Sequence, residues 1–258
     1  MSVVPFNING QEMQISGNLE NPRVVWIMDG VGKQMVSSPE DYGFDAADQL
    51  IVFPDGRFKD VITFFDQKQH ELGAISAVVF FLFGADEISQ PLQSFEEVTS
   101  SAIHSFDEYF HPRGPRELPR RPVHEVVDAC YSAIDRILAQ FPSCSVFTTE
   151  PSLRRSRHGF AAARAIEVGR QMKRRDERHH HATVLRQLHA VIRGKAEGDR
   201  LGGRYPINEE FFDEDGVRMT PTALRSSLVR IMAFVGAEMG LPGDWGNPRE
   251  IEGLRVAF

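Results

Sequence analysis

The sequence predicts an α/β domain of three layers, in which a mostly parallel sheet lies between two layers of helices. Short apolar segments rich in β-branched residues alternate with longer segments whose apolar residues recur at helical spacing. Segment 74–84 is apolar throughout, as a central strand covered on both faces would be. Strands that alternate with helices favour a parallel sheet with helices on both sides.

The strands are expected where short apolar runs end in turn-forming residues. Segment 23–28 lies between Asn-Pro and Asp-Gly, and segment 49–53 is followed by Pro-Asp-Gly. Further strands are expected at 74–84 and 144–151, and a short final strand within the glycine-rich segment 198–207. These strands are the scaffold on which the loops are placed.

Helices are expected at 57–70, 92–109 and 123–141, and the long basic stretch after residue 151 is expected to form two helices or one bent helix. The last helix begins with Thr220 as its N-cap and a proline at its first helical position. Four prolines and a glycine predict an extended loop at 111–122.

Length and composition favour one domain with flanking segments. The 258 residues are 41% hydrophobic and 25% charged, which is ordinary globular usage. We divide the chain into an N-terminal extension (1–22), a domain (23–240) and a C-terminal tail (241–258). No apolar run is long enough for a membrane span, no secretory signal is visible, and neither cysteine has a Cys-x-x-Cys partner. A cytoplasmic or nuclear protein is expected.

Charge is distributed unevenly along the chain. Segment 151–204 holds 14 Lys and Arg against 5 Asp and Glu, a net of +9, so the remaining residues carry −16 of the total of −7. Arginine dominates this segment and also the loop at 111–122, and it suits bidentate binding of phosphate and stacking on bases. The alternative is a solvated surface, or ion pairs with the acidic remainder of the same protein.

Five loops carry the residues that bear on function. "MDGVGKQM" follows the first strand, "PDGRFKD" the second, "FGADEIS" the third and "TTEPSLRRSR" the fourth, while "DEDGVRMTP" precedes the last helix. In parallel sheets, functional loops lie at the carboxyl ends of the strands. In this order the loops resemble the sequence blocks of the SGNH hydrolases, also called GDSL-type esterases and lipases, over about residues 23–240.

The resemblance implies an SGNH-like fold but lacks the family's catalytic groups. In that family, Gly-Asp-Ser carries the nucleophile, a later Gly and a Gly-x-Asn-Asp block form the oxyanion hole, and Asp-x-x-His supplies the acid and base. Here Gly30 stands at the serine position and Arg218 at the histidine position. The matching positions, which we call the vestigial pocket, are Asp29, Gly30, Gly56, Gly84, Asp86, Asp215 and Arg218.

These replacements remove the expected chemistry. Glycine has no nucleophile, and arginine stays protonated and cannot act as a base. Asp86, with Glu87 beside it, replaces Asn-Asp, and a carboxylate repels a developing oxyanion. Asp215 and Arg218 are expected either to form an ion pair with each other or to point to solvent.

No other group in the sequence clearly takes over this chemistry. Ser37 and Ser38 are interpreted as capping residues before Pro39, and both cysteines as core residues. Consecutive histidines at 179–181 point in different directions on a helix and do not close on one ion. No metal, cofactor or small-molecule substrate is therefore expected.

The sequence thus favours an inactive SGNH-like protein that binds RNA, protein subunits or both, within a ribonucleoprotein complex. Inactive SGNH-like domains that bind RNA give a precedent of type only. Two alternatives stay open: an adaptor that docks an acidic or helical protein partner, and an atypical esterase with displaced catalytic residues. The residues expected to bind RNA or another anion are Arg113, Arg116, Arg120, Arg121, Arg154, Arg155, Arg157, Lys173, Arg174, Arg175 and Arg178.

Overall fold

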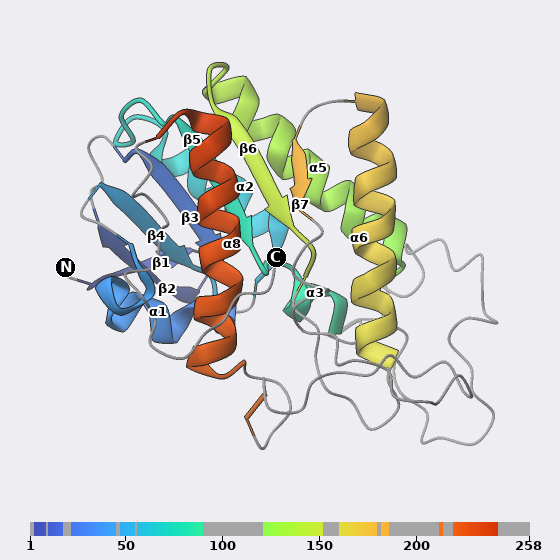
Figure 1. Cartoon of the computed structure of the whole chain (residues 1–258). Helices are drawn as coiled ribbons and strands as arrows, with labels where there is room; N and C mark the ends of the chain where they lie inside the picture. Colours follow the sequence, from blue (N-terminus) through green and yellow to red (C-terminus); the bar gives the residue numbers. More distant parts are fainter. Residues whose placement is uncertain are drawn as a thin grey trace.

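The computed structural model describes most of a seven-stranded α/β domain (Figure 1). The described residues are 3–8, 10–17, 22–44, 47–54, 56–89, 121–151, 160–179, 182–185, 212–213 and 219–241. The strands are β1 (Val3–Ile8), β2 (Gln11–Gly17), β3 (Val24–Met28), β4 (Asp48–Val52), β5 (Ala77–Phe81), β6 (Ser145–Thr149) and β7 (Thr183–Leu185). Helices are η1 (Gly30–Gly32), α1 (Lys33–Ser37), η2 (Pro39–Tyr42), α2 (Phe58–Lys68), α3 (Ala85–Ser89), α5 (Val123–Gln140), α6 (Phe160–His179) and α8 (Pro221–Met239).

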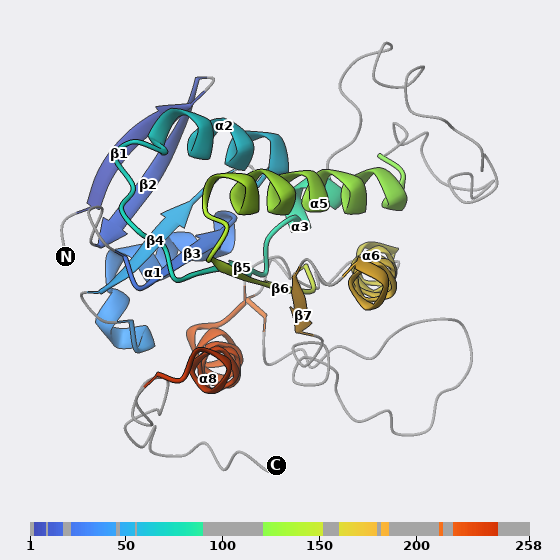
Figure 2. The ribbon, with the colours of Figure 1, turned by 90° about the horizontal axis from the view of Figure 1, so that it is seen from above.

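The sheet has the order β1-β2-β4-β3-β5-β6-β7. The five strands from β4 to β7 in this order are parallel, while β1 and β2 form a hairpin that joins β4 in antiparallel pairing. Helices α2 and α5 lie over one face, α1 and α8 over the other, and α6 lies beside the β7 edge (Figure 2). The predicted three-layer fold with a mostly parallel sheet is confirmed.

Each strand of the parallel part sends alternate side chains into two cores. Along β3, Val24, Trp26 and Met28 pack toward α8, whereas Val25 and Ile27 pack toward α2 and α5. Every residue of β3, β4 and β5 is buried, because helices cover both faces. This explains why the strands are continuous apolar runs rather than alternating patterns.

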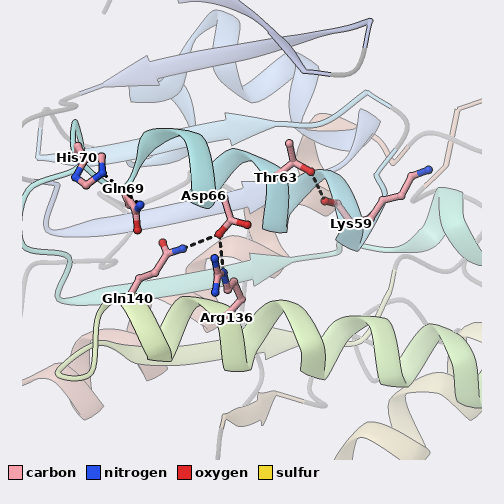
Figure 3. Close-up of polar contacts among 7 residues, drawn as sticks. All are labelled: Lys59, Thr63, Asp66, Gln69, His70, Arg136 and Gln140. Atoms are coloured by element: carbon pink, nitrogen blue, oxygen red, sulfur yellow. Dashed lines mark hydrogen bonds and ion pairs between the residues drawn. The ribbon is translucent and has the colours of Figure 1, made fainter.

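The α2–α5 layer is also joined on its outer surface. The Asp66 carboxylate of α2 accepts hydrogen bonds from Arg136 Nε at 2.6 Å and from Gln140 Nε2 at 2.8 Å, both on α5 (Figure 3). The Asp66–Arg136 ion pair is exposed, and such pairs contribute little to stability. Its main consequence is that the one arginine of α5 is engaged with α2.

Two predictions about the chain's organisation were wrong. The segment before residue 23, predicted as an extension, supplies β1 and β2, so it belongs to the sheet. The stretch after residue 151, predicted to be helical, contains α6 and then the short strand β7, which pairs with β6. These three strands lie at or next to the edges of the sheet, where the local sequence pattern is weaker than in the central strands.

The strands β3 to β6 and the helices α2, α5 and α8 lie where the sequence predicted them, whereas η1, α1, η2 and α3 were not predicted. Thr220 caps α8 through its side chain, which accepts from Ala223 N at 3.4 Å. The predicted capping by Ser37 and Ser38 was wrong: Ser38 occupies the N-cap position of η2 without a side-chain capping hydrogen bond, and Ser37 is the last residue of α1. The helix predicted at 92–109, the strand predicted within 198–207 and the tail beyond 241 lie outside the described residues.

None of the helices in the described part of the chain is long and apolar enough to span a membrane.

Candidate site at the carboxyl edge of the sheet

The strand order places one loop pair at the point where ligands bind in open α/β sheets. From β3 the chain passes to β4 on one side and then to β5 on the other, so the order reverses between β3 and β5. Crevices form outside the carboxyl ends of strands at such a switch point. Asp29 and Gly30 follow β3, and Gly84 and Asp86 follow β5, so four positions of the vestigial pocket fall here.

The turn after β3 is held by Asp29. Its carboxylate is fully buried and accepts a hydrogen bond from Val31 N at 3.1 Å, which caps η1. A Cβ at Gly32 would lie 2.7 Å from Met28 Cβ and 2.8 Å from the Val52 side chain. The turn is therefore packed tightly against β3 and β4, and the Asp29 carboxylate is directed to its own backbone.

The chain leaves β5 through a strained residue. Leu82 is buried with φ of +54°, in a region that residues other than glycine seldom adopt. Its backbone N–H donates to the Thr149 side-chain oxygen at 2.7 Å, across to the end of β6. Gly84 follows with φ of +95°, and a Cβ there would lie 3.2 Å from the Phe58 ring. Such backbone strain costs about 1–3 kcal/mol, and strained residues cluster at active sites and ligand-binding segments.

Replacing Thr149 with valine is expected to lower the free energy of unfolding by about 1–3 kcal/mol, because the buried Leu82 N–H would lose its acceptor. Chemical denaturation of the purified variant measures this difference. Thr148→Val is the control, since the Thr148 hydroxyl donates to the Thr149 carbonyl at 3.3 Å, whereas the Thr149 hydroxyl accepts from a buried backbone N–H. Equal losses in the two variants would contradict a special role for Thr149.

Glu87 joins four elements at this edge. Its side chain is 4% exposed, and Oε2 accepts from Phe58 N at 3.1 Å at the start of α2. Oε1 pairs with Arg121, just before α5, and the Arg121 carbonyl accepts a hydrogen bond from Arg164 of α6. Burial raises the pKa of Glu87, while the Phe58 N–H, Arg121 and Arg57 act to lower it.

The sequence placed Glu87 beside Asp86 but assigned it no role. The one visible signal was a glutamate directly before the apolar Ile88 in "GADEI". A glutamate that packs into the fold beside such a residue needs a partner for its charge. Its partner Arg121 lies 34 residues later, and no local pattern connects the two. The structure therefore adds Glu87 and Arg164 to the residues of this edge.

The other predicted pocket positions are only partly placed. Gly56 is buried after β4 with φ of +40°, and its N–H donates to the Phe53 carbonyl at 3.1 Å. Asp86 belongs to α3, and the structure describes the backbone of this residue only. Asp215 and Arg218 lie outside the described residues, so their proposed ion pair stays a prediction.

The predicted anion-binding residues divide into three groups. Arg121 pairs with Glu87, and Arg175 pairs with Asp128, so both have the intramolecular use that the sequence left open. Lys173 and Arg174 are exposed on α6, and Arg178 lies further along the same helix. The others lie outside the described residues: Arg113, Arg116, Arg120, Arg154, Arg155 and Arg157.

Three side chains that the sequence analysis weighed in place of the missing serine are described: Ser37, Cys130 and Cys144. Ser37 is exposed and donates to the Lys33 carbonyl at 3.2 Å. Cys130 and Cys144 are buried, as predicted, and burial raises the pKa of both thiols, that of Cys144 to about 12, so they stay protonated near neutral pH. Within the same part of the chain, no group of three His, Cys, Asp or Glu side chains could hold a metal ion.

Comparison with solved structures identifies the fold. A protein provisionally assigned as an acylhydrolase from Bacteroides fragilis NCTC 9343 aligns with a TM-score of 0.57 and 12% identity, covering 86% of this chain and 92% of that one. A protein provisionally assigned as a platelet activating factor from Streptococcus pneumonia aligns with a TM-score of 0.53 and 11% identity, covering 83% and 85%. No protein-family model and no curated protein sequence matches the chain. The predicted three-layer α/β fold is shared with these acylhydrolase-like structures, and likeness at this level of identity shows the fold alone.

Proposed function

We propose that the chain is a catalytically inactive SGNH-like domain that binds RNA as a subunit of a ribonucleoprotein complex. The observation that carries the loss of catalysis is the turn after β3. Gly30 occupies the serine position of the resemblance, and the neighbouring Asp29 carboxylate is buried and capped onto Val31 N. Without a serine hydroxyl at this turn, no nucleophilic oxygen is available there to form a covalent acyl-enzyme.

An esterase assay with a short acyl ester is expected to show no turnover above the uncatalysed rate. Turnover that Asp215→Ala abolishes would overturn the inactive assignment and support the atypical esterase. A second variant, Gly30→Ser with Asp86→Asn and Arg218→His, restores the group types of the family. Hydrolysis by this variant would support the alignment of the vestigial pocket with the family's blocks.

The proposed RNA surface is the exposed side of α6, together with the arginine-rich segments that precede and follow this helix in the sequence. Arg170, Lys173 and Arg174 are exposed at helical spacings of three and four residues, so they share one side of α6. Arg170 also forms an ion pair with Glu167 at 3.6 Å. Exposed ion pairs of this kind contribute little to stability. A row of cations on one helix side supports contact with a phosphate backbone.

Binding of labelled single-stranded and structured RNA over a salt series tests this surface. The double variant Lys173→Glu/Arg174→Glu is expected to weaken binding more than tenfold and to reduce the slope of log K against log salt by about 1 for each phosphate that is no longer neutralised. The matched control is Lys33→Glu/Lys59→Glu, which changes the net charge equally at exposed positions on α1 and α2.

The two double variants separate a local surface from a general charge effect. Equal weakening in both would contradict α6 as the contact surface. Absence of RNA binding by the unaltered protein at low salt would overturn direct RNA recognition. The basic side of α6 would then be assigned to an acidic protein partner, as the adaptor alternative expects.

A further inference from the structure

Arg175 of α6 is held between two side chains of α5. Its guanidinium lies 4.5 Å from the centre of the Tyr131 ring and pairs with the Asp128 carboxylate. The Tyr131 hydroxyl in turn donates to the Met172 carbonyl of α6 at 2.8 Å, and Tyr131 is 1% exposed. The ring is therefore a fixed platform, and the guanidinium stacked on it is pre-positioned.

Asp128 holds Arg175 from the solvent side. The Asp128 side chain is 61% exposed and the Arg175 side chain 34% exposed, so water reaches the pair. Exposed ion pairs contribute only about 0–1 kcal/mol, and salt screens them further. An RNA phosphodiester carries one negative charge, as the Asp128 carboxylate does, and its oxygens can accept both N–H groups of a guanidinium. A phosphate that the exposed cations of α6 draw to this side can therefore compete with Asp128 for Arg175.

The surroundings place Arg175 at a border between opposite charges. On α5, Glu125, Asp128 and Asp135 fall on one side of the helix, while Arg136 of α5 is engaged with Asp66 (Figure 3). On α6, Lys173 and Arg174 are exposed. A polyanion lying along α6 would meet Arg175 at the edge of the acidic α5 side, which repels it.

We infer that Asp128 is an internal competitor for Arg175, and that an RNA phosphate displaces it when the polyanion binds along α6. This inference rests on the proposed RNA binding. It adds that Asp128 limits the affinity of the protein for RNA and the position of the RNA along α6. The stacked guanidinium stays on Tyr131 during the exchange, so only the anionic partner changes. Asp128 and its helix would then define one boundary of the RNA surface.

Three variants measured in the same RNA titration test the exchange. Asp128→Asn removes the competing charge and is expected to tighten binding about two- to fivefold, the range that a pair of about 0.5–1 kcal/mol allows. Asp135→Asn is the control, because it removes the same charge two turns further along the same helix side. It is expected to tighten binding less, because Asp128 is the carboxylate that pairs with Arg175. Arg175→Gln is expected to weaken binding several-fold.

The decisive comparison is made in the Arg175→Gln background. There, Asp128→Asn is expected to have no larger effect than Asp135→Asn, because the shared partner is absent. Equal effects of Asp128→Asn and Asp135→Asn with Arg175 present would overturn the competitor while leaving the RNA-binding proposal intact. Absence of RNA binding by the unaltered protein would overturn both. If Arg175→Gln does not fold, Arg175→Lys, which keeps the charge but not the bidentate geometry, serves in its place.

Discussion

Replacing Glu87 with alanine is expected to lower the free energy of unfolding by about 3 kcal/mol. The change leaves the Phe58 N–H without its acceptor and removes the acidic partner of Arg121 in a buried setting. Breaking a buried ion pair from one side costs about 3–5 kcal/mol, and the partial exposure of Arg121 places this case at the lower end. Urea or guanidinium denaturation measures the loss. A change below about 1 kcal/mol would contradict the bridging role.

Glu87→Gln separates the hydrogen bond from the charge. Its amide oxygen can still accept from Phe58 N, so this variant is expected to be closer in stability to the unaltered protein than Glu87→Ala. The alanine variant differs from the unaltered protein in size as well as in chemistry, so the glutamine variant is the sharper test of the charge.

The same variant predicts a pH dependence with a definite sign. Because burial raises the pKa of Glu87 above its ordinary value of 4.5, the folded state holds the proton more tightly than the unfolded state. The unaltered protein is therefore expected to gain stability relative to Glu87→Gln as the pH falls from above the raised pKa toward 4.5. Denaturation of both proteins across this range measures the difference. A relative gain as the pH rises would show that Arg121 and the Phe58 N–H outweigh burial.

Gly17→Ala is expected to destabilise the protein by about 3 kcal/mol or more. Gly17 ends β2 with φ of +107°, and a Cβ there would lie 2.1 Å from the Asp48 carbonyl oxygen. The backbone strain costs about 1–3 kcal/mol and the overlap a similar amount, since the oxygen belongs to the backbone of β4 and cannot turn away. Thermal or chemical denaturation of the variant measures the sum.

Gly10→Ala is the matched control for this prediction. Gly10 also has a positive φ, of +81°, but nothing lies within 4 Å of a Cβ at that position. This variant carries the conformational cost alone, about 1–2 kcal/mol. Similar losses at the two glycines would contradict close pairing between β2 and β4, and with it the assignment of the N-terminal hairpin to the sheet.

The candidate edge lies in a fold shared with acylhydrolase-like structures, and its first turn has glycine directly after the buried Asp29. The groups that hold the edge together are Asp29, Thr149 and Glu87, and each of them is occupied by a backbone N–H. Polar groups used in this way rigidify the loops at the switch point. We therefore expect substitutions here to change stability first, whereas substitutions on the exposed side of α6 change binding.

The sequence by itself determined the central architecture, because periodicity and turn residues are local properties. The strands β3 to β6, the helices α2, α5 and α8, and the Thr220 cap were all predicted from runs of fewer than twenty residues. Glycine at position 30, where the resembled family has serine, could also be recognised from the sequence, because residue identity and order suffice to align the first loop with the family's first block. These features need no knowledge of what packs beside them.

The tertiary structure decided what depends on pairing between distant segments. The N-terminal hairpin became part of the sheet because β2 pairs with β4, and β7 exists because β6 offers it an edge. Glu87 finds Arg121, and Arg175 finds Asp128 across 47 residues, only once α3, α5 and α6 are packed together. A charged residue looks the same in sequence whether it binds a ligand or a neighbouring helix. Only its place in the packed fold distinguishes the two uses.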